Sequence, residues 1–198
     1  MLISLLRHGE VEGPALVFRG RSDPPLTELG QEQMRRAALA FERPRIDRLV
    51  SSPRRRCLTF AMQWSQQHGV ALTTRAALSE IDFGAWEELS PQEARRRDPQ
   101  CYARLQSRPD AWCSPHGESY ADFRARVLGA LHELCGDGIE HLGIVTHAGV
   151  MRVILCELLD LAPRNAQCIA LVPAASCRIW WDATGRRRLL ELRGGNPS

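Results

Sequence analysis

The sequence predicts an α/β protein of three layers, in which helices cover both faces of a mostly parallel central sheet with one antiparallel strand. Three observations support this prediction. Short apolar runs alternate with segments of helical periodicity, a proline-containing segment interrupts the alternation once, and the last apolar runs follow one another closely. We expect a single domain over residues 1–198, with a small helical cap inserted at about residues 84–118.

The parallel strands are predicted from four short segments. They cover residues 2–6, 46–52, 70–75 and 142–146, and polar or turn-forming residues flank each of them. A strand that is buried on both faces gives an apolar run of this length, whereas a helix needs a longer segment.

Two helices are predicted between the first strands. Residues 26–42 begin with Thr27 as N-cap and carry apolar side chains at helical spacing. Residues 52–69 begin with Ser52 as N-cap, continue with a proline at the first helical position, and stop at Gly69. Each helix joins one strand to the next parallel strand.

Two more helices are predicted in the second half of the chain. One has Ser119 as N-cap and stops at Gly136. The other follows the strand at 142–146, starts near residue 149 and ends before Pro163, because proline does not continue a helix.

Two segments depart from the strand–helix alternation. Residues 84–118 contain four prolines and only short helical pieces, which predicts an inserted cap. Residues 168–192 predict antiparallel strands, with turns near Pro173 and Gly185.

Length and composition exclude several classes of protein. The 198 residues suit one domain with a core, and 44% hydrophobic with 25% charged residues is typical of globular proteins. No apolar run reaches the roughly 20 residues of a membrane helix, and Arg7 interrupts the first apolar run too early for a signal peptide. We expect a cytoplasmic protein without a membrane segment.

Cysteine and charge content narrow the range of partners. The seven cysteines are odd in number and form no C-x-x-C pair, so we expect reduced thiols. All 26 basic residues are arginine, whose planar fork of donors suits phosphate or carboxylate. A net charge of +3 is too small to indicate a nucleic-acid partner. We expect no metal ion and no other cofactor.

Histidines follow two of the predicted strands. His8 comes after the first strand and His147 after the fourth, each close to a glycine, Gly9 or Gly149. Ligands of open α/β sheets bind beyond the carboxyl ends of the strands, so both imidazoles are expected to face one crevice. The glycines allow tight turns and leave amides free for an anion, so Gly149 is a candidate phosphate ligand.

Arginines bring further donors to the same end of the sheet. Three of them follow the strand at 46–52, and the spacing leaves open which one faces the crevice: Arg54, Arg55 or Arg56. Two imidazoles and several guanidiniums form a pocket for a dianion, and phosphate is its natural occupant.

Each candidate also has a purely structural interpretation. A single histidine after a strand is more often a hydrogen-bonded structural residue, and the parallel placement of His8 and His147 is what favours a site. Glu80 is either a surface acid or a proton donor, and His116 is either a solvated cap residue or a substrate contact. The other histidines are expected on the surface: His68, His132 and His141.

Four motifs occur in order: Arg7-His8-Gly9-Glu10 after a strand, then SSPRRRCLTFA, LSEIDFGAWEE and VTHAGVMR. In these motifs, and over residues 2 to about 180, the chain resembles the histidine phosphatase superfamily, also called phosphoglycerate-mutase-like. The resemblance implies that His8 is the nucleophile and that His147 binds the phosphoryl group. It also implies that Arg7 and Arg56 hold the phosphoryl oxygens and that Glu80 protonates the leaving oxygen.

The chain departs from the family after the first motif. Many members have a threonine and then an asparagine there, whereas Val11 and Pro14 occupy these places here. We expect Arg19 or Arg21 to replace the missing donor, so that both, with His116 of the cap, are candidate substrate contacts.

The resemblance implies a metal-independent phosphomonoesterase that acts through a phosphohistidine on a small phosphorylated metabolite. The length, GRSDPPLTELGQEQM and EIDFGAWEE are similar to the α-ribazole phosphatase type, which acts on α-ribazole 5'-phosphate. One alternative is phosphoryl transfer of the phosphoglycerate-mutase type. The other is a non-catalytic binding or scaffold protein. We expect a monomer or a homodimer, with the small substrate as partner.

Overall fold

One mixed sheet forms the centre of the molecule. The structure, a computed structural model, describes residues 1–42, 44–135, 138–182 and 184–194. The six strands lie in the order β3-β2-β4-β1-β5-β6. Their bounds are β1 Leu2–Arg7, β2 Arg48–Ser51, β3 Ala71–Thr74, β4 His141–Thr146, β5 Ser176–Trp181 and β6 Arg187–Arg193. β5 pairs antiparallel with both β1 and β6, while β1 to β4 pair in parallel, which confirms the predicted sheet.

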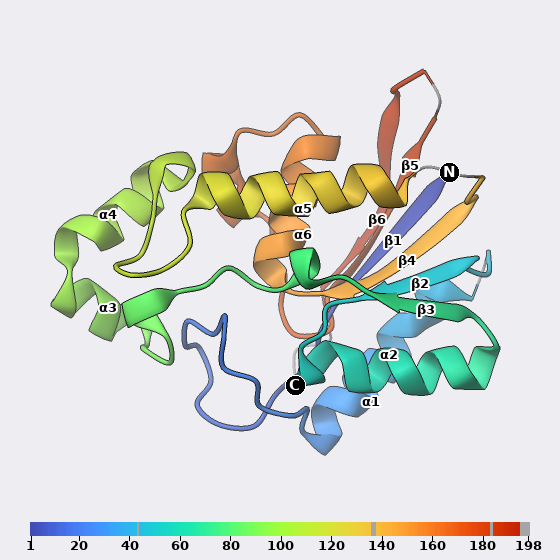
Figure 1. The fold of residues 1–198 in the computed structure, drawn as a ribbon, viewed down its shortest axis with the longest axis horizontal. Coiled ribbons are helices and arrows are strands. Elements are labelled where there is room, and N and C mark those ends of the chain that lie inside the picture. Colours follow the sequence, from blue (N-terminus) through green and yellow to red (C-terminus); the bar gives the residue numbers. More distant parts are fainter. Residues whose placement is uncertain (43, 136–137, 183, 195–198) are drawn as a thin grey trace.

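Helices cover both faces of this sheet. The pair α1 (Glu28–Ala37) and α2 (Arg55–His68) lies on one side, and α5 (Tyr120–Leu134) and α6 (Ala148–Leu158) lie on the other (Figure 1). Neighbouring residues of a strand pack against opposite helix layers, because side chains point alternately to the two faces of the sheet. Leu6, Leu49 and Val145 belong to the core under α1 and α2, whereas Leu5, Val50 and Ile144 belong to the core under α5 and α6.

Three of the predicted helix ends are confirmed. The Thr27 side chain caps α1 by accepting from the amide of Gly30, and the Ser119 side chain caps α5 in the same way. Gly69 ends α2 in the left-handed region, with φ 62°, which favours glycine. The predicted stop at Gly136 lies outside the described residues.

The predicted N-cap of α2 is wrong. The helix begins at Arg55 with Arg54 as N-cap, two residues later than expected. Ser52 instead prolongs the strand pairing, because its amide donates to the carbonyl of Val145 at 3.0 Å. Its hydroxyl lies 2.8 Å from His147 Nε2, so the side chain serves the histidine rather than the helix.

The C-terminal strands are confirmed only from residue 176 onward. Residues 163–168 form a 3₁₀ helix, and the chain from there to residue 175 is irregular, where the sequence predicts a strand. The place beside β1 is taken by β5, so this earlier segment has no strand to pair with. It crosses the sheet end instead, where the carbonyl of Leu171 accepts a hydrogen bond from Arg7.

His141 is buried, at 2% exposure, which contradicts its predicted surface position. It lies at the start of β4, where its ring bonds to Ser4 Oγ at 2.7 Å and to the carbonyl of Pro44 at 2.9 Å. These partners satisfy the imidazole far from the carboxyl ends of the strands, so His141 is a structural histidine.

Residues 84–118 consist of short helices, α3 (Pro91–Arg97) and α4 (Pro99–Ser107) among them. Both lie beside the sheet at its carboxyl end, next to the start of α5 (Figure 1). Over the described ranges of the chain, no helix is long and apolar enough to span a membrane.

Candidate active site

The pairing of β1 with β4 brings the two histidines together. Arg7 and Thr146 are partners in the parallel register, so the next residue on each strand, His8 and His147, leaves the sheet at the same point. The amide of His8 donates to the carbonyl of Thr146 at 3.0 Å, and the imidazole centroids lie 5.3 Å apart. The predicted crevice therefore exists at the ends of these strands.

Gly9 is required by close packing rather than by its own backbone angles. A Cβ on Gly9 would lie 2.1 Å from the carbonyl oxygen of Gly30, and a Cβ on Gly30 would lie 2.0 Å from the carbonyl oxygen of Glu10. The turn after β1 thus lies directly against the start of α1, and any side chain would separate them.

The hydrogen bond of His8 determines its tautomer. Nδ1 lies 2.8 Å from the carbonyl oxygen of Gly9. Since a carbonyl only accepts, Nδ1 carries the proton and Nε2 keeps its lone pair. Burial lowers the pKa of His8 well below 6.5, and the cations of Arg7 and Arg56 lower it further. His8 is therefore a neutral imidazole with a nucleophilic Nε2.

His147 has the opposite tautomer. The Nε of Arg56 donates to His147 Nδ1 at 3.3 Å, so Nδ1 is the acceptor and Nε2 carries the proton. That proton points to Ser52 Oγ at 2.8 Å. Burial lowers the pKa of His147 well below 6.5, and the charge of Arg56 adds to the effect. The two rings thus offer one lone pair and one N–H donor at the same strand ends.

Arg56 joins His147 to the loop before α1. Its guanidinium is fully buried and donates to the carbonyl oxygens of Ser22 at 2.6 Å and of Arg19 and Gly20 at 3.3 Å each. Counting the bond to His147, these contacts use four of the five N–H groups of an arginine, which leaves one for a phosphoryl oxygen.

Arg7 holds a charge in a buried place. Burial lowers its pKa to about 10, and the nearby carboxylate of Glu80 partly opposes that decrease. One terminal nitrogen donates to the carbonyl of Leu171, while Nε is buried and has no acceptor among the described residues. A buried donor of this kind costs free energy until an acceptor reaches it, which fits the binding of an oxyanion beside His8.

Glu80 lies at the start of α6. Its carboxylate accepts from the amide of Gly149 at 3.0 Å and from the amide of Ile81 at 3.0 Å. In this structure the amide of Gly149, predicted to face a phosphate, is therefore engaged by the Glu80 carboxylate.

We expect Gly149→Ala to misplace Glu80 without unfolding the protein. The new Cβ would lie 2.1 Å from Glu80 Oε1, which is the end of a flexible side chain and moves away. Displacing an acid by about 1 Å costs about 100-fold in turnover. Gly129→Ala on α5 is the matched control, because its Cβ would meet no atom within 4 Å of the described structure. Equal kcat values for the two variants would contradict this role of Gly149.

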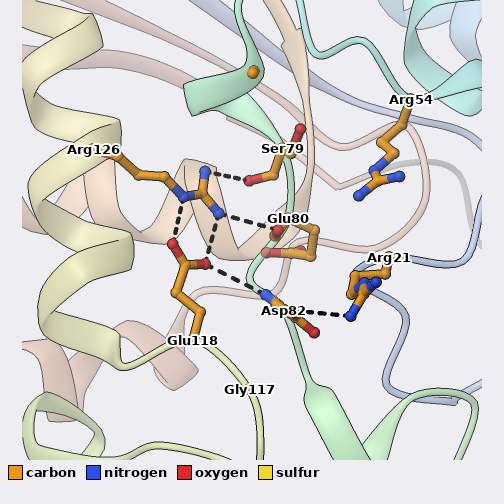
Figure 2. Close-up of a pocket in the computed structure, with 9 residues that line it drawn as sticks. Arg21, Arg54, Ser79, Glu80, Asp82, Gly117, Glu118 and Arg126 are labelled. Atoms are coloured by element: carbon orange, nitrogen blue, oxygen red, sulfur yellow. Dashed lines mark hydrogen bonds and ion pairs between the residues drawn. The ribbon is translucent and has the colours of Figure 1, made fainter.

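A polar cavity of about 490 Å³ opens beside these groups (Figure 2). It is lined by Arg21, Arg54, Ala76, Ser79, Glu80, Asp82, Gly117, Glu118 and Arg126. Glu80 lines the cavity and its charge also acts on Arg7, so the cavity adjoins the histidine site, although neither histidine is among the described residues of its lining. The volume lies in the range of small-molecule sites.

Arg126 and Glu118 support the loop that carries Glu80. Two parallel hydrogen bonds of 2.6 and 2.8 Å join the guanidinium to the Glu118 carboxylate. The same guanidinium donates to the carbonyl oxygens of Ser79 and Glu80 (Figure 2) and to that of Ala77. Neither residue could be predicted from the sequence, because an arginine on the polar face of a helix gives no sign of which loop it will contact.

The structure separates the three predicted substrate contacts. Arg21 lines the cavity and pairs with Asp82 at 3.7 Å. The guanidinium of Arg19 is bound by the carboxylate of Glu88 at 2.9 and 3.0 Å, and His116 is exposed. Neither Arg19 nor His116 is among the described residues that line the cavity. Their positions favour structural roles in the loop and the cap.

The two buried histidines should make stability depend on pH. Because the pKa values of His8 and His147 are lowered by folding, the unfolded chain binds more protons once the pH falls below about 6.5. The free energy of unfolding should then fall by at most about 1.4 kcal/mol per pH unit for each histidine. Urea unfolding at a series of pH values measures this slope. His8→Asn should flatten it, and an unchanged slope would contradict the assignment.

Among the described residues, no group of three or more His, Cys, Asp or Glu side chains is placed to hold a metal ion. All seven cysteines are unpaired, and burial raises the pKa of Cys57, next to His147, to about 12.

A mixed α/β sheet with two histidines, buried arginines and a carboxyl group at its strand ends is typical of enzymes that act on phosphate groups. Residues 3–192 match the model of the histidine phosphatase superfamily (branch 1), and the chain belongs to that superfamily. It is therefore a hydrolase of the phosphatase type, and several of its relatives are named as phosphatases.

Two relatives illustrate the kinds of phosphatase to which the chain is similar. Glucosyl-3-phosphoglycerate phosphatase of Mycolicibacterium vanbaalenii is 31% identical over 196 residues, which cover 93% of this chain and 84% of the relative. Phosphoserine phosphatase 1 of Hydrogenobacter thermophilus is 29% identical over 159 residues, covering 79% and 75%. The crystal structure of the α-ribazole phosphatase from Shigella flexneri superposes with a TM-score of 0.81 at 21% identity, covering 97% and 96%, which shows a shared fold.

Proposed function

We propose that the protein hydrolyses small phosphate monoesters through a phosphohistidine on His8. The observation that carries this proposal is the tautomer of His8. Its Nδ1–H is held by the carbonyl of Gly9, which leaves the Nε2 lone pair as nucleophile beside the cation of Arg7. The superfamily membership supports the same chemistry.

In the first step His8 Nε2 attacks phosphorus, and the bond from phosphorus to the ester oxygen breaks. Arg7 Nε and the remaining N–H of Arg56 stabilise the equatorial oxygens. The Nε2–H of His147 joins them by sharing its proton between Ser52 and a phosphoryl oxygen. Glu80, in its protonated form, gives its proton to the leaving alcohol.

In the second step water attacks the phosphohistidine. Glu80 is now a carboxylate and takes a proton from that water, which returns the acid to its first state. His8 leaves as the neutral imidazole that the surrounding arginines favour. Phosphate departs, and the cycle needs no group beyond these side chains. We therefore propose that the reaction is independent of metal ions.

The substrate belongs to the same proposal. Relatives named for phosphoserine and for glucosyl-3-phosphoglycerate, together with a cavity of about 490 Å³, support a small hydrophilic phosphate monoester. The fold shared with an α-ribazole phosphatase keeps α-ribazole 5'-phosphate as a second candidate. The seven unpaired cysteines support a reducing compartment such as the cytoplasm.

A screen of phosphorylated metabolites tests the proposal directly. Phosphate release should occur from p-nitrophenyl phosphate and from one or more metabolites, with and without EDTA. Loss of activity with EDTA that added Mg²⁺ restores would contradict metal independence. Transfer of the phosphoryl group to a second metabolite instead of water would favour a mutase, and no turnover of any ester would favour a binding protein.

A further inference from the structure

Three arginines line the cavity, and two of them are neutralised there. Arg126 is paired with Glu118 by two short hydrogen bonds, and Arg21 lies 3.7 Å from Asp82. The guanidinium of Arg54 has no hydrogen-bond or ion-pair partner among the described residues, and its Nε is buried without an acceptor. Among the described residues of the lining, Arg54 is therefore the arginine without an ion-pair partner.

The side chain of Arg54 is aimed at the substrate space. Arg54 is the N-cap residue of α2, and its extended backbone sends the guanidinium toward the cavity from the side opposite Arg126 (Figure 2). The next residue along, Arg55, has the same charge but is exposed and is not among the described residues of the lining. Arg54 and Arg55 are the same residue type, so only their positions at the start of α2 explain why Arg54 lines the cavity and Arg55 does not.

Arg7 and Arg56 are the arginines whose charges act most strongly on His8. The charge of Arg54 is not among the largest effects on the pKa of His8, and on His147 its effect comes after those of Arg56 and Arg7. Arg54 and Glu80 line the same cavity, so an alcohol that takes its proton from Glu80 as it leaves phosphorus lies in the space that Arg54 also faces. Arg54 is half-buried and its Nε is buried without an acceptor, which is costly, and a carboxylate satisfies the planar fork of an arginine with two parallel bonds.

We propose that Arg54 binds a carboxylate on the alcohol part of the substrate, so that the protein prefers phosphate esters of hydroxy acids and amino acids. The inference rests on the proposed phosphatase activity. Because Asp82 and Glu118 already pair with Arg21 and Arg126, the single charge of Arg54 matches a carboxylate better than a second phosphate dianion. Ala76 is the single apolar side chain in the described lining, so an apolar aromatic leaving group would find little to pack against.

Matched pairs of substrates test the inference. O-phosphoserine and O-phosphoethanolamine share the phosphate and the amine and differ in the carboxylate. The pair of 3-phosphoglycerate and glycerol 3-phosphate differs in the same way. The native protein should have the higher kcat/KM for the acid in at least one pair. Arg54→Met should reduce that preference about 10- to 100-fold, the scale of a hydrogen-bonded charge pair.

Two further variants complete the test. Arg55→Met removes the same charge one residue away and should leave the preference within about twofold, because an exposed charge acts weakly. Arg54→Lys keeps the charge without the fork and should restore the preference only in part.

The outcomes separate the two proposals. Hydrolysis of p-nitrophenyl phosphate without any preference for acids would overturn the inference and leave the phosphatase activity standing. An equal loss for both members of a pair in Arg54→Met would also overturn it, since Arg54 would then act on the phosphoryl group. No hydrolysis of any ester would overturn both.

Discussion

Replacing His8 by asparagine should abolish both turnover and the covalent intermediate. Asparagine keeps a side-chain N–H that can bond to the carbonyl of Gly9, as Nδ1 of the imidazole does at 2.8 Å, but it has no nucleophilic nitrogen at the position of Nε2. Turnover should fall by about 10⁴- to 10⁶-fold, the scale seen when an enzyme loses its nucleophile. Brief incubation with a labelled monoester and acid or base quenching measures the phosphoenzyme.

A phosphohistidine is lost in acid and survives in base, so the native protein should retain label only after the base quench. His141→Asn is the matched control, because His141 is also a buried histidine on the same pair of strands but lies at the opposite end. That variant should be less stable and still become labelled. Label on a cysteine or serine, or label retained by His8→Asn, would contradict the nucleophile assignment.

The position of the two histidines could be predicted because it depends on strand ends alone. A short apolar run that stops at His8 and another that stops at His147 specify two buried strands, and parallel neighbours end at the same edge of a sheet. Local signals also sufficed for Thr27 and Gly69, since capping and the left-handed region depend on the residue itself.

Ser52 shows where local signals mislead. The pattern of a serine followed by proline is a good helix start. In the structure the pairing of β2 with β4 continues through the amide of Ser52, so the helix begins later. A tertiary hydrogen bond overrides a local preference here, and the sequence near residue 52 contains no sign of the partner, which is 93 residues away at Val145.

The supporting residues of the site were missed for a related reason. Arg126 acts through the carbonyl of Glu80, 46 residues earlier in the chain, and this contact exists only because α5 packs beside that loop. In the same way, spacing alone could not decide which of Arg54, Arg55 and Arg56 faces the crevice. In the structure the turn into α2 buries Arg56, points Arg54 at the cavity and exposes Arg55. Side-chain direction at a helix start depends on backbone geometry that residue type does not specify.

Glu80→Gln should slow hydrolysis of alkyl phosphates far more than hydrolysis of aryl phosphates. The glutamine keeps the shape of the side chain beside Gly149 but has no proton to give. An alkoxide leaves poorly without protonation, so an alkyl ester should lose about 10²- to 10⁴-fold in the phosphorylation step, the usual scale of general acid catalysis. The nitrophenolate of p-nitrophenyl phosphate needs little protonation and should lose much less. Rapid-quench measurement of the first turnover isolates this step from attack by water.

Asp82→Asn provides the control within the same cavity. Asp82 also lines the cavity, but its carboxylate accepts from the amide of Gly84 at 2.8 Å and pairs with Arg21. Removing that charge should slow alkyl and aryl esters by the same factor, because the carboxylate orients Arg21 and transfers no proton to either leaving group. If instead Glu80→Gln slowed both esters equally and Asp82→Asn discriminated between them, Asp82 would be the acid and Glu80 a residue that positions the start of α6.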